Sequence, residues 1–156
     1  MIELRKVRLE DRELLWNINQ KYLYEMTAFY DDEMDEKGNY LYGHFEEYFT
    51  DPAREALFIY CDGRLAGFAM VIPYSNIGQK PDFVMAEFTV FPAFRGKHVA
   101  IDVARMIFES HKGNWEVKYN EKNAPARSLW TKATAEYCPG KVILNEDETV
   151  LVFSTN

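Results

Sequence analysis

Residues 88–100 read FTVFPAFRGKHVA, and this stretch decides how the rest of the chain is interpreted. A hydrophobic strand stops at Pro92, because proline cannot donate to a strand ladder. A short loop with Arg95 and Gly96 follows, and a helix begins near Lys97. Such a joint turns several backbone N–H groups towards one point, and the helix N-terminus adds about half a positive charge. The sequence therefore predicts an anion site suited to a pyrophosphate.

On either side of this stretch, strand-like and helix-like hydrophobic patterns follow one another along the chain. Strands are expected at residues 2–8, 56–60, 64–72, 83–91, 115–119, 142–144 and 149–153. Helices are expected at residues 11–27, 40–49, 97–111 and 123–134. Asp62–Gly63 is a hairpin turn signal between the second and third strands. This order predicts a mixed α/β sheet with helices on its faces.

Length and composition indicate one domain over residues 1–156, since 156 residues suffice for one core and not for two ordinary domains. No repeat or linker interrupts the chain. No apolar run approaches the roughly 18 residues that span a bilayer, so a membrane protein is not expected. The first residues carry charges and no apolar core segment, which argues against a secretory signal.

The net charge of −7, without a basic stripe, argues against a nucleic-acid partner. It could favour a cationic small substrate, although solubility alone would explain it. Cys61 and Cys138 are too few for a disulfide scaffold and form no metal-like cluster with the histidines, so no metal is expected. Reduced cysteines are typical of a cytoplasmic protein. His44 and His111 are expected on the surface of two helices.

Two motifs in this chain resemble those of the GNAT N-acetyltransferase superfamily. VFPAFRGKHVA at residues 90–100 resembles V-x-P-x-x-[RQ]-G-x-G-[IV]-[AG], and NEKNAPARSLWTKA at residues 120–133 resembles N-x-x-A-x-x-[LF]-[YW]-x-K. GNWEV at residues 113–117 together with NAPARSLW is similar to a small, poorly characterised bacterial branch. The resemblance covers the whole chain and implies a mostly antiparallel sheet of about six to seven strands with helices on both faces.

The resemblance also implies acetyl-CoA as co-substrate and a set of residues that hold it. Backbone N–H groups would bind the pyrophosphate, from Arg95, Gly96, Lys97, His98, Val99 and Ala100. Backbone groups of Val90 and Phe91 would hold the pantetheine arm and polarise the acetyl carbonyl. Asn123 would bond to the same arm, and Trp130 would pack near its sulfur end.

Two positions depart from the family pattern. His98 stands where the second glycine is usual, which puts phosphate affinity in doubt. Trp130 stands where many members have a tyrosine that protonates the leaving thiolate, and an indole can donate but cannot act as that acid. Tyr119 and Tyr137 are the alternative acids, unless a thiol leaving group needs none.

Glu87, in the motif strand, is the candidate general base. An amine must lose a proton before it attacks a thioester, and a carboxylate can accept it. The alternative is a solvated or salt-bridged strand residue. Aromatic side chains of the first two helices would pack the core or line an acceptor site, and the acidic run at residues 31–36 is either a solvated loop or a guide for a cationic amine.

These observations lead to three hypotheses. The first is acetyl transfer from acetyl-CoA to a primary amine of a small molecule, which could be cationic, by direct attack in a ternary complex. The second is an acyl-CoA-binding module without turnover, acting as a sensor or subunit. The third is a structural homodimer with a degenerate cleft, and a homodimer is also compatible with the first hypothesis.

Overall fold

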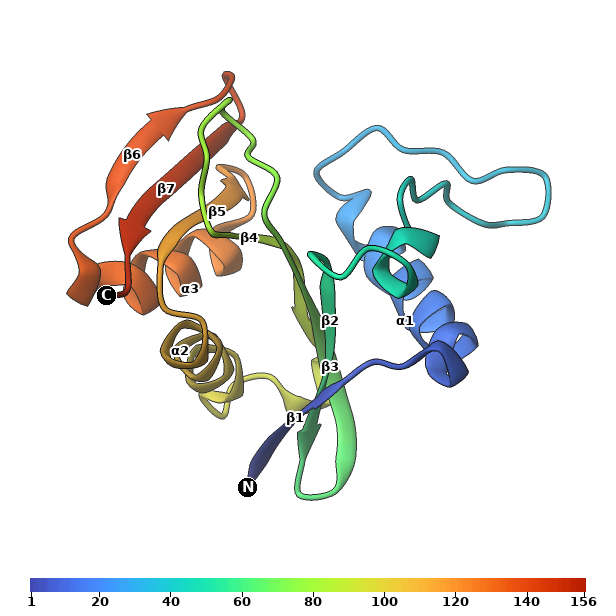
Figure 1. Cartoon of the computed structure of the whole chain (residues 1–156). Helices are drawn as coiled ribbons and strands as arrows, with labels where there is room; N and C mark the ends of the chain where they lie inside the picture. The colour runs from blue at the N-terminus through green and yellow to red at the C-terminus, as the bar shows by residue number, and fades with distance from the viewer.

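Seven strands form one sheet in the order β1-β2-β3-β4-β5-β7-β6 in the computed structural model, which describes residues 1–156 (Figure 1). The strands are β1 Ile2–Lys6, β2 Glu55–Cys61, β3 Arg64–Ile72, β4 Phe83–Val90, β5 Asn114–Asn120, β6 Gly140–Ile143 and β7 Glu148–Ser154. The α-helices are α1 Arg12–Met26, α2 Val99–Ser110 and α3 Ala124–Thr134. The expected mixed, mostly antiparallel sheet with helices on both faces is confirmed.

The β2–β3 hairpin turns where the sequence predicts it. Asp62 and Gly63 have φ values of +50° and +78°, which is the geometry that matches the twist of two paired strands. Further along β3, Gly67 allows the neighbouring strand to come close, since a Cβ there would lie 2.0 Å from the carbonyl oxygen of Thr89. Gly67 thus permits the close pairing of β3 with β4, the middle strand of the sheet.

The pairing of β4 with β5 is parallel and short. It runs only from Phe83↔Trp115 to Met85↔Val117, whereas all other neighbouring strands are antiparallel. Against β3, Met70 faces Glu87 and Val71 faces Met85, so Ala86 is an extra residue in a β-bulge. The bulge bends β4 at the point where it leaves β5, and the two strands diverge beyond it (Figure 1). The sheet is thus split in its middle.

Two hydrophobic clusters fill the two faces of the sheet. On one face, α2 buries Val103, Ile107 and Phe108, and α3 buries Trp130, among the side chains of β4, β5 and β7. On the other face, α1 packs Leu15 and Ile18 against aromatic side chains of β2 and β3. Burial of each such side chain contributes about 1.5–3 kcal/mol. None of these helices is both long and apolar enough to cross a bilayer.

The helix expected at residues 40–49 is wrong. Only Glu46–Phe49 forms a short 3₁₀ helix, labelled η2, and the chain before it is irregular. His44 has a φ of +66°, which no α-helix contains. The aromatic spacing that suggested a helix comes instead from side chains such as Tyr42 and Phe45, which pack towards the sheet from a loop.

The two histidines expected on helix surfaces also lie elsewhere. His44 is exposed but sits in the irregular loop. His111 follows the last residue of α2 and is partly buried, with its Nε2 2.9 Å from Oε1 of Glu55. Its ring contacts Phe83 and Trp115 edge-on, so this histidine joins α2 to the sheet.

Candidate active site

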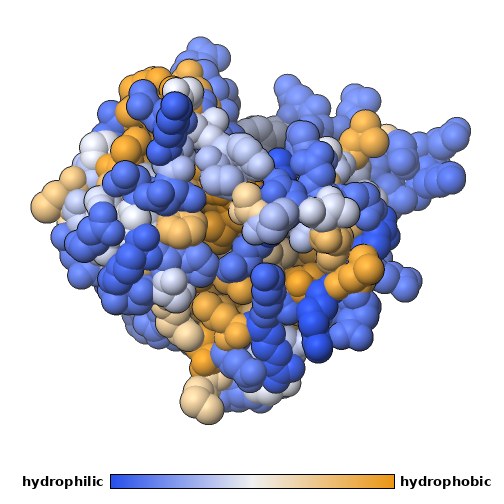
Figure 2. All heavy atoms as spheres, viewed as in Figure 1, coloured by the Kyte–Doolittle hydropathy of each residue, from blue (hydrophilic) through white to orange (hydrophobic).

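The split between β4 and β5 holds two adjoining cavities, of about 430 and 320 Å³. They share the residues Tyr22, Met26, Phe88, Asn123, Ala126 and Trp130, so they form one continuous cleft. Hydrophobic side chains gather in the middle of this face of the molecule, between its two halves (Figure 2). We call the cavity near α2 the outer cavity and the one that contains Glu87 the inner cavity.

At the outer end of the cleft, the N-terminus of α2 presents backbone N–H groups without partners. The amides of residues 96–101 make no hydrogen bond within the protein, and Asp102 is the first to donate, to the carbonyl of His98 at 3.1 Å. Gly96 and His98 both have positive φ, +80° and +61°, which turns the loop back on itself. Lys97 is exposed and forms no ion pair, so the loop suits an anion.

Arg95 joins two elements through its side chain, and its backbone N–H is not free to bind a ligand. Its N–H already donates to the carbonyl of Pro92 at 3.2 Å, which departs from the expectation for this amide. Its Nε donates to the carbonyl of Val90 at 2.7 Å, and its two Nη atoms bind the carboxylate of Glu25 at 2.8 and 2.9 Å. The side chain therefore connects the end of β4 to α1 beside the outer cavity.

The backbone N–H and C=O groups of successive β4 residues point alternately towards β3 and into the split between β4 and β5. The N–H of Phe91 donates to the carbonyl of Ala66 at 2.7 Å, so in this antiparallel pair Phe91 and Thr89 face β3, and Val90 and Phe88 face the cleft. The carbonyl of Phe91 also accepts from Phe94 at 2.9 Å. The structure therefore brings Val90 to the cleft but not Phe91, and it adds Phe88, which sequence reasoning missed.

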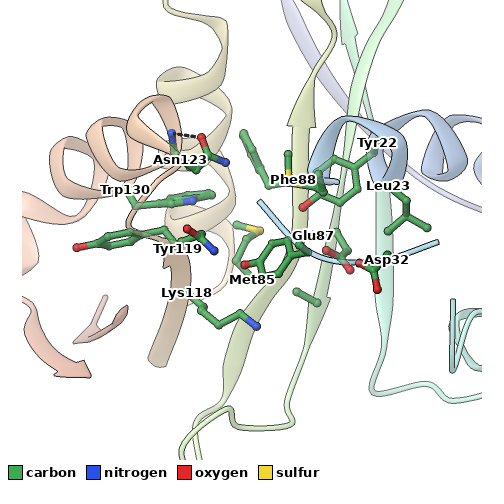
Figure 3. A pocket seen from close by; sticks show the side chains of 15 residues that line it. Tyr22, Leu23, Asp32, Met85, Glu87, Phe88, Lys118, Tyr119, Asn123 and Trp130 are labelled. Atoms are coloured by element: carbon green, nitrogen blue, oxygen red, sulfur yellow. Dashed lines mark hydrogen bonds between the residues drawn. The ribbon is translucent and has the colours of Figure 1, made fainter. Parts of the chain in front are cut away.

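The opposite wall of the cleft comes from α3. Asn123 caps this helix by accepting a hydrogen bond from the N–H of Ala126 at 3.2 Å, and its side chain lines both cavities (Figure 3). Trp130 is buried and packs edge-on against Phe88, with ring centroids 5.0 Å apart. Both residues, which the sequence motif predicts to contact a ligand, line both cavities.

Glu87 lies in the inner cavity and is largely buried. Its Oε2 accepts a hydrogen bond of 2.7 Å from the hydroxyl of Tyr42, which belongs to the irregular loop before η2. Burial raises the pKa of Glu87, although hydrogen bonds from Tyr42 and Tyr22 and the charge of Lys118 oppose this. A carboxylate whose pKa lies above its ordinary value is a better proton acceptor once it is ionised. The solvated-strand alternative does not describe this side chain.

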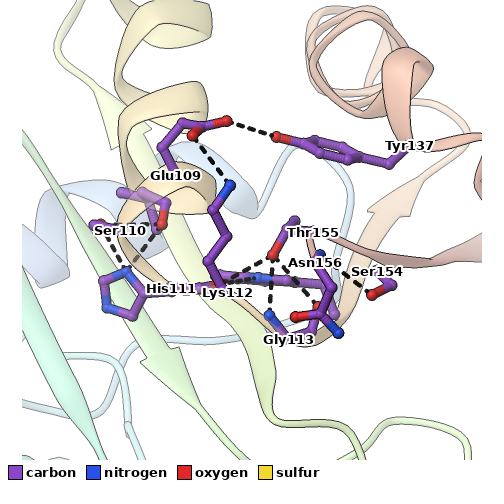
Figure 4. Close-up of polar contacts among 11 residues, drawn as sticks. Glu109, Ser110, His111, Lys112, Gly113, Tyr137, Ser154, Thr155 and Asn156 are labelled. Carbon is purple, nitrogen blue, oxygen red and sulfur yellow. Dashed lines mark hydrogen bonds and ion pairs between the residues drawn. The ribbon is translucent and has the colours of Figure 1, made fainter.

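The two alternative tyrosine acids do not point into the cleft. Tyr137 lines neither cavity; it stacks on Phe153, and its hydroxyl lies 3.4 Å from Oε1 of Glu109 in the last turn of α2 (Figure 4). Tyr119 lines the inner cavity with part of its side chain, but its hydroxyl is directed away from Glu87 (Figure 3). The structure thus does not bring Tyr137 to the site.

Tyr22 is a hydroxyl-bearing residue that does lie in the cleft. It projects from α1 opposite Asn123 and Trp130, and it lines both cavities (Figure 3). Burial, with the nearby Glu87 carboxylate, holds its pKa well above the ordinary value, so the hydroxyl stays protonated and can donate. The helical spacing of α1 predicted that Tyr22 is on the buried face, but not that it reaches the split.

The acidic run at residues 31–36 contributes one side chain to the cleft. Asp32 lines the inner cavity. Asp35 instead accepts hydrogen bonds from the N–H groups of Lys37 and Asn39, at 2.8 and 3.0 Å, and so stabilises its own turn. Most of the run therefore behaves as a solvated loop.

A comparison with family models identifies the relatives of this chain. Residues 15–135 match the acetyltransferase (GNAT) family. The chain belongs to the GNAT acetyltransferase family. A search of curated proteins finds no match.

Solved structures of GNAT proteins share this architecture from end to end. Spermidine N-acetyltransferase from Vibrio cholerae, in complex with CoA and spermine, has a TM-score of 0.67 at 14% identity and covers 99% of this chain and 95% of its own. PaiA N-acetyltransferase from Thermoplasma acidophilum, in complex with coenzyme A, has a TM-score of 0.62 at 14% identity over 99% of both chains. An acetyltransferase from Thermus thermophilus has a TM-score of 0.70 at 12% identity, covering 99% of this chain and 97% of its own. At such identities the likeness shows the fold.

In this GNAT acetyltransferase, the residues expected from the motifs fall into two groups. The following lie at the cleft or at the free amides of α2: Glu87, Val90, Gly96, Lys97, His98, Val99, Ala100, Asn123 and Trp130. Arg95 reaches the cleft by its side chain alone. Phe91 and Tyr137 are directed elsewhere.

Proposed function

We propose that this protein transfers an acetyl group from acetyl-CoA to a primary amine of a small molecule, by direct attack in a ternary complex. The observation that carries the proposal is the arrangement of one cleft, with unpartnered amides at residues 96–101 at its outer end and the buried Glu87 at its inner end. The anionic end and the reacting end of an acyl-CoA need such groups at the two ends of one channel.

The residues present fit the co-substrate. The free amides and the cation of Lys97 suit a diphosphate, because several N–H groups and a helix N-terminus face one point. The apolar wall formed by Phe88, Leu129 and Trp130 suits the arm that follows, and Asn123 offers a polar side chain beside it. When bound, acetyl-CoA would supply an acetyl group activated as a thioester.

The chain's own groups would then act on the amine. Glu87 accepts the proton of the ammonium, and the freed nitrogen forms a bond to the acetyl carbon while the C–S bond breaks and its electron pair leaves with the thiolate. Backbone N–H groups of Phe88 or Val90 that face the cleft stabilise the charge that develops on the carbonyl oxygen. As the amide forms, the nitrogen loses a second proton, which passes through solvent or the hydroxyl of Tyr22 to the thiolate. Holding both reactants in one cleft contributes through proximity.

A binding module without turnover is the second candidate, because Trp130 cannot act as an acid and Tyr137 points away from the cleft. The variant Glu87→Gln separates the two candidates, since it keeps the size of the side chain and removes the base. For an enzyme, kcat falls by about 100-fold or more while the Kd for acetyl-CoA changes little. A binding module shows no thiol release before or after the change.

The decisive experiment combines calorimetric titration with acetyl-CoA and a free-thiol assay over a panel of primary amines. Heat of binding and thiol release that depends on an amine support the proposal. Absence of binding heat would contradict both the proposed acetyl transfer and the binding-module alternative. The remaining hypothesis would then be a structural protein with a degenerate cleft. We further propose that the protein works in the cytoplasm as a single domain, where Cys61 and Cys138 stay as thiols.

A further inference from the structure

A third cavity, of about 340 Å³, adjoins the cleft on the α1 face of the sheet. It shares Met85, Ala86, Glu87 and Lys118 with the inner cavity, so it opens directly onto the candidate base. Its remaining walls come from the chain around η2 and from the β3–β4 loop, and they include Tyr42, Tyr48, Arg54, Tyr74 and Asn76. We call this cavity the acceptor chamber, because it reaches Glu87 from the side opposite the free amides.

The chamber contains an arginine whose hydrogen-bonding capacity is largely unused. The Arg54 side chain is only 9% exposed, and its Nε is buried without a hydrogen bond. The carboxylates of Glu47 and Asp51 lie 3.3 and 3.5 Å from Nε, longer than the roughly 2.7–2.9 Å of a charge-assisted hydrogen bond. Aromatic rings hold the guanidinium in place, with the ring of Tyr74 centred 4.7 Å away. A buried guanidinium held in one orientation suits the bidentate binding of a carboxylate.

Lys118 is a second cation in the same chamber. It extends from β5 into the space near Glu87 (Figure 3) and lines both the inner cavity and the chamber. Its Nζ forms an ion pair with Glu148 at 3.2 Å, and about a third of its side chain, 34%, stays exposed. Glu87 is the only carboxylate among the chamber's lining residues, and the carboxylates paired with Arg54 and Lys118, those of Glu47, Asp51 and Glu148, lie outside that lining.

Hydrogen bonds to the sheet hold one wall of the chamber. Glu116 is fully buried on β5 and accepts hydrogen bonds from the N–H of Asn76, at 2.9 Å, and from the hydroxyl of Ser75. These bonds hold the β3–β4 loop, which carries Tyr74 and Asn76, against the sheet. The loop that carries Tyr74, whose ring packs on Arg54, is therefore joined to the sheet.

We propose that the acceptor is an amino acid, a small amine that also carries a carboxylate. This rests on the proposed acetyl transfer at Glu87. The amine lies at Glu87, and the carboxylate is bound by Lys118 and Arg54. The carboxylate would supply the hydrogen-bond acceptors that Arg54 lacks, since its Nε has no hydrogen bond and the carboxylates of Glu47 and Asp51 stay 3.3 and 3.5 Å away. The second ammonium of a polyamine offers no acceptor to Arg54.

Matched acceptor pairs that differ only in the carboxylate test this inference. L-lysine is compared with cadaverine, and L-ornithine with putrescine, by kcat/KM in the free-thiol assay and by calorimetric titration in the presence of CoA. We expect the amino acid of each pair to be preferred at least tenfold. Equal use of both members, or preference for the diamine, would overturn the inference.

Variants of the two cations show whether the preference arises in the chamber. Arg54→Met is expected to raise the KM of the amino acids at least tenfold and to leave the diamines within about twofold, with Arg54→Lys in between. Lys118→Met is the second variant if Arg54→Met does not fold, since Lys118 is partly exposed. An unchanged preference in the folded variants would contradict the assignment. Binding of amino acids without thiol release would contradict the transfer reaction and still support the chamber as their site.

Discussion

The hydroxyl of Tyr42 donates a hydrogen bond of 2.7 Å to Oε2 of Glu87, although 45 residues separate them in sequence. This bond lowers the pKa of Glu87, and burial raises it. In Tyr42→Phe the opposing contribution is lost, so the pKa of Glu87 rises further. We expect the acidic limb of the kcat/KM profile to move to higher pH, with a loss of about tenfold at neutral pH.

The matched control for this change is Tyr24→Phe. Tyr24 is also a tyrosine, but it is exposed to solvent on α1, so removal of its hydroxyl is expected to leave the pH profile of kcat/KM unchanged. A Tyr42→Phe enzyme whose acidic limb coincides with that of the wild type would show that Glu87 is not the group that titrates.

His98 is the residue at which this chain departs from the glycine of the family motif, and its φ of +61° gives the physical reason for that glycine. A residue with a Cβ is strained in this region, whereas glycine is not. We expect His98→Gly to raise the free energy of unfolding by about 0.5–1 kcal/mol, after the entropy that glycine costs. His98→Ala keeps the strain and is the control. Equal stability of the two variants in urea titrations would refute this account.

A substitution at Gly96 tests whether the loop of free amides at residues 96–101 binds the co-substrate. Its φ of +80° disfavours any other residue, although a Cβ there would meet no atom within 4 Å. Gly96→Ala is therefore expected to displace the loop through its backbone and to weaken acetyl-CoA binding about tenfold or more in a calorimetric titration. Gly43→Ala, which also meets no atom and has no positive φ, is expected to bind as the wild type does.

The pair of His111 and Glu55 makes stability depend on pH. The hydrogen bond and charge of Glu55 raise the pKa of His111 above its ordinary value, although burial opposes this. The pair therefore contributes fully below the pKa of the unfolded chain, about 6.5, and its contribution is lost as the pH rises through the folded pKa. We expect the free energy of unfolding to fall over this range in the wild type. In Glu55→Gln the dependence of the free energy of unfolding on pH should flatten over this range. Adding His111→Gln to that variant should not change this dependence further.

Tyr137 is expected to be dispensable for the reaction. Its hydroxyl faces Glu109 at 3.4 Å and lines no part of the cleft. Tyr137→Phe should keep kcat within about twofold of the wild type, whereas Tyr22→Phe should lower it. A large loss of kcat in Tyr137→Phe alone would reopen the assignment of the acid.

Most of the fold could be predicted because periodicity and turn residues agree locally. Alternation around Asp62–Gly63 predicted the hairpin, and the break at Pro92 predicted where β4 ends. The helix expected at residues 40–49 failed because aromatic side chains at helical spacing can also pack from an irregular loop. The bulge at Ala86 could not be predicted from the sequence, because it depends on how β4 pairs with β3.

Within the candidate cleft, the sequence motif accounts for the lining residues that it contains and not for those that come from distant segments. The amides after Gly96 and the cap at Asn123 follow from local sequence. Tyr42, Arg54 and Lys118 come from three separate segments, and no spacing relates them to the motif. Phe91 was misplaced because the direction of a backbone N–H in a strand depends on the partner strand, here the carbonyl of Ala66.

The short parallel ladder between β4 and β5 has a consequence for how the protein holds its ligand. Within the sheet, the pairs from Phe83↔Trp115 to Met85↔Val117 are all that join the first half of the chain to the second. A molecule seated in the gap would bridge two strand edges that no longer reach each other. Amide hydrogen exchange around Phe88 and Asn120 should therefore slow when acetyl-CoA is present. Under the proposed function, the acyl donor would then be a structural element that completes the interrupted sheet.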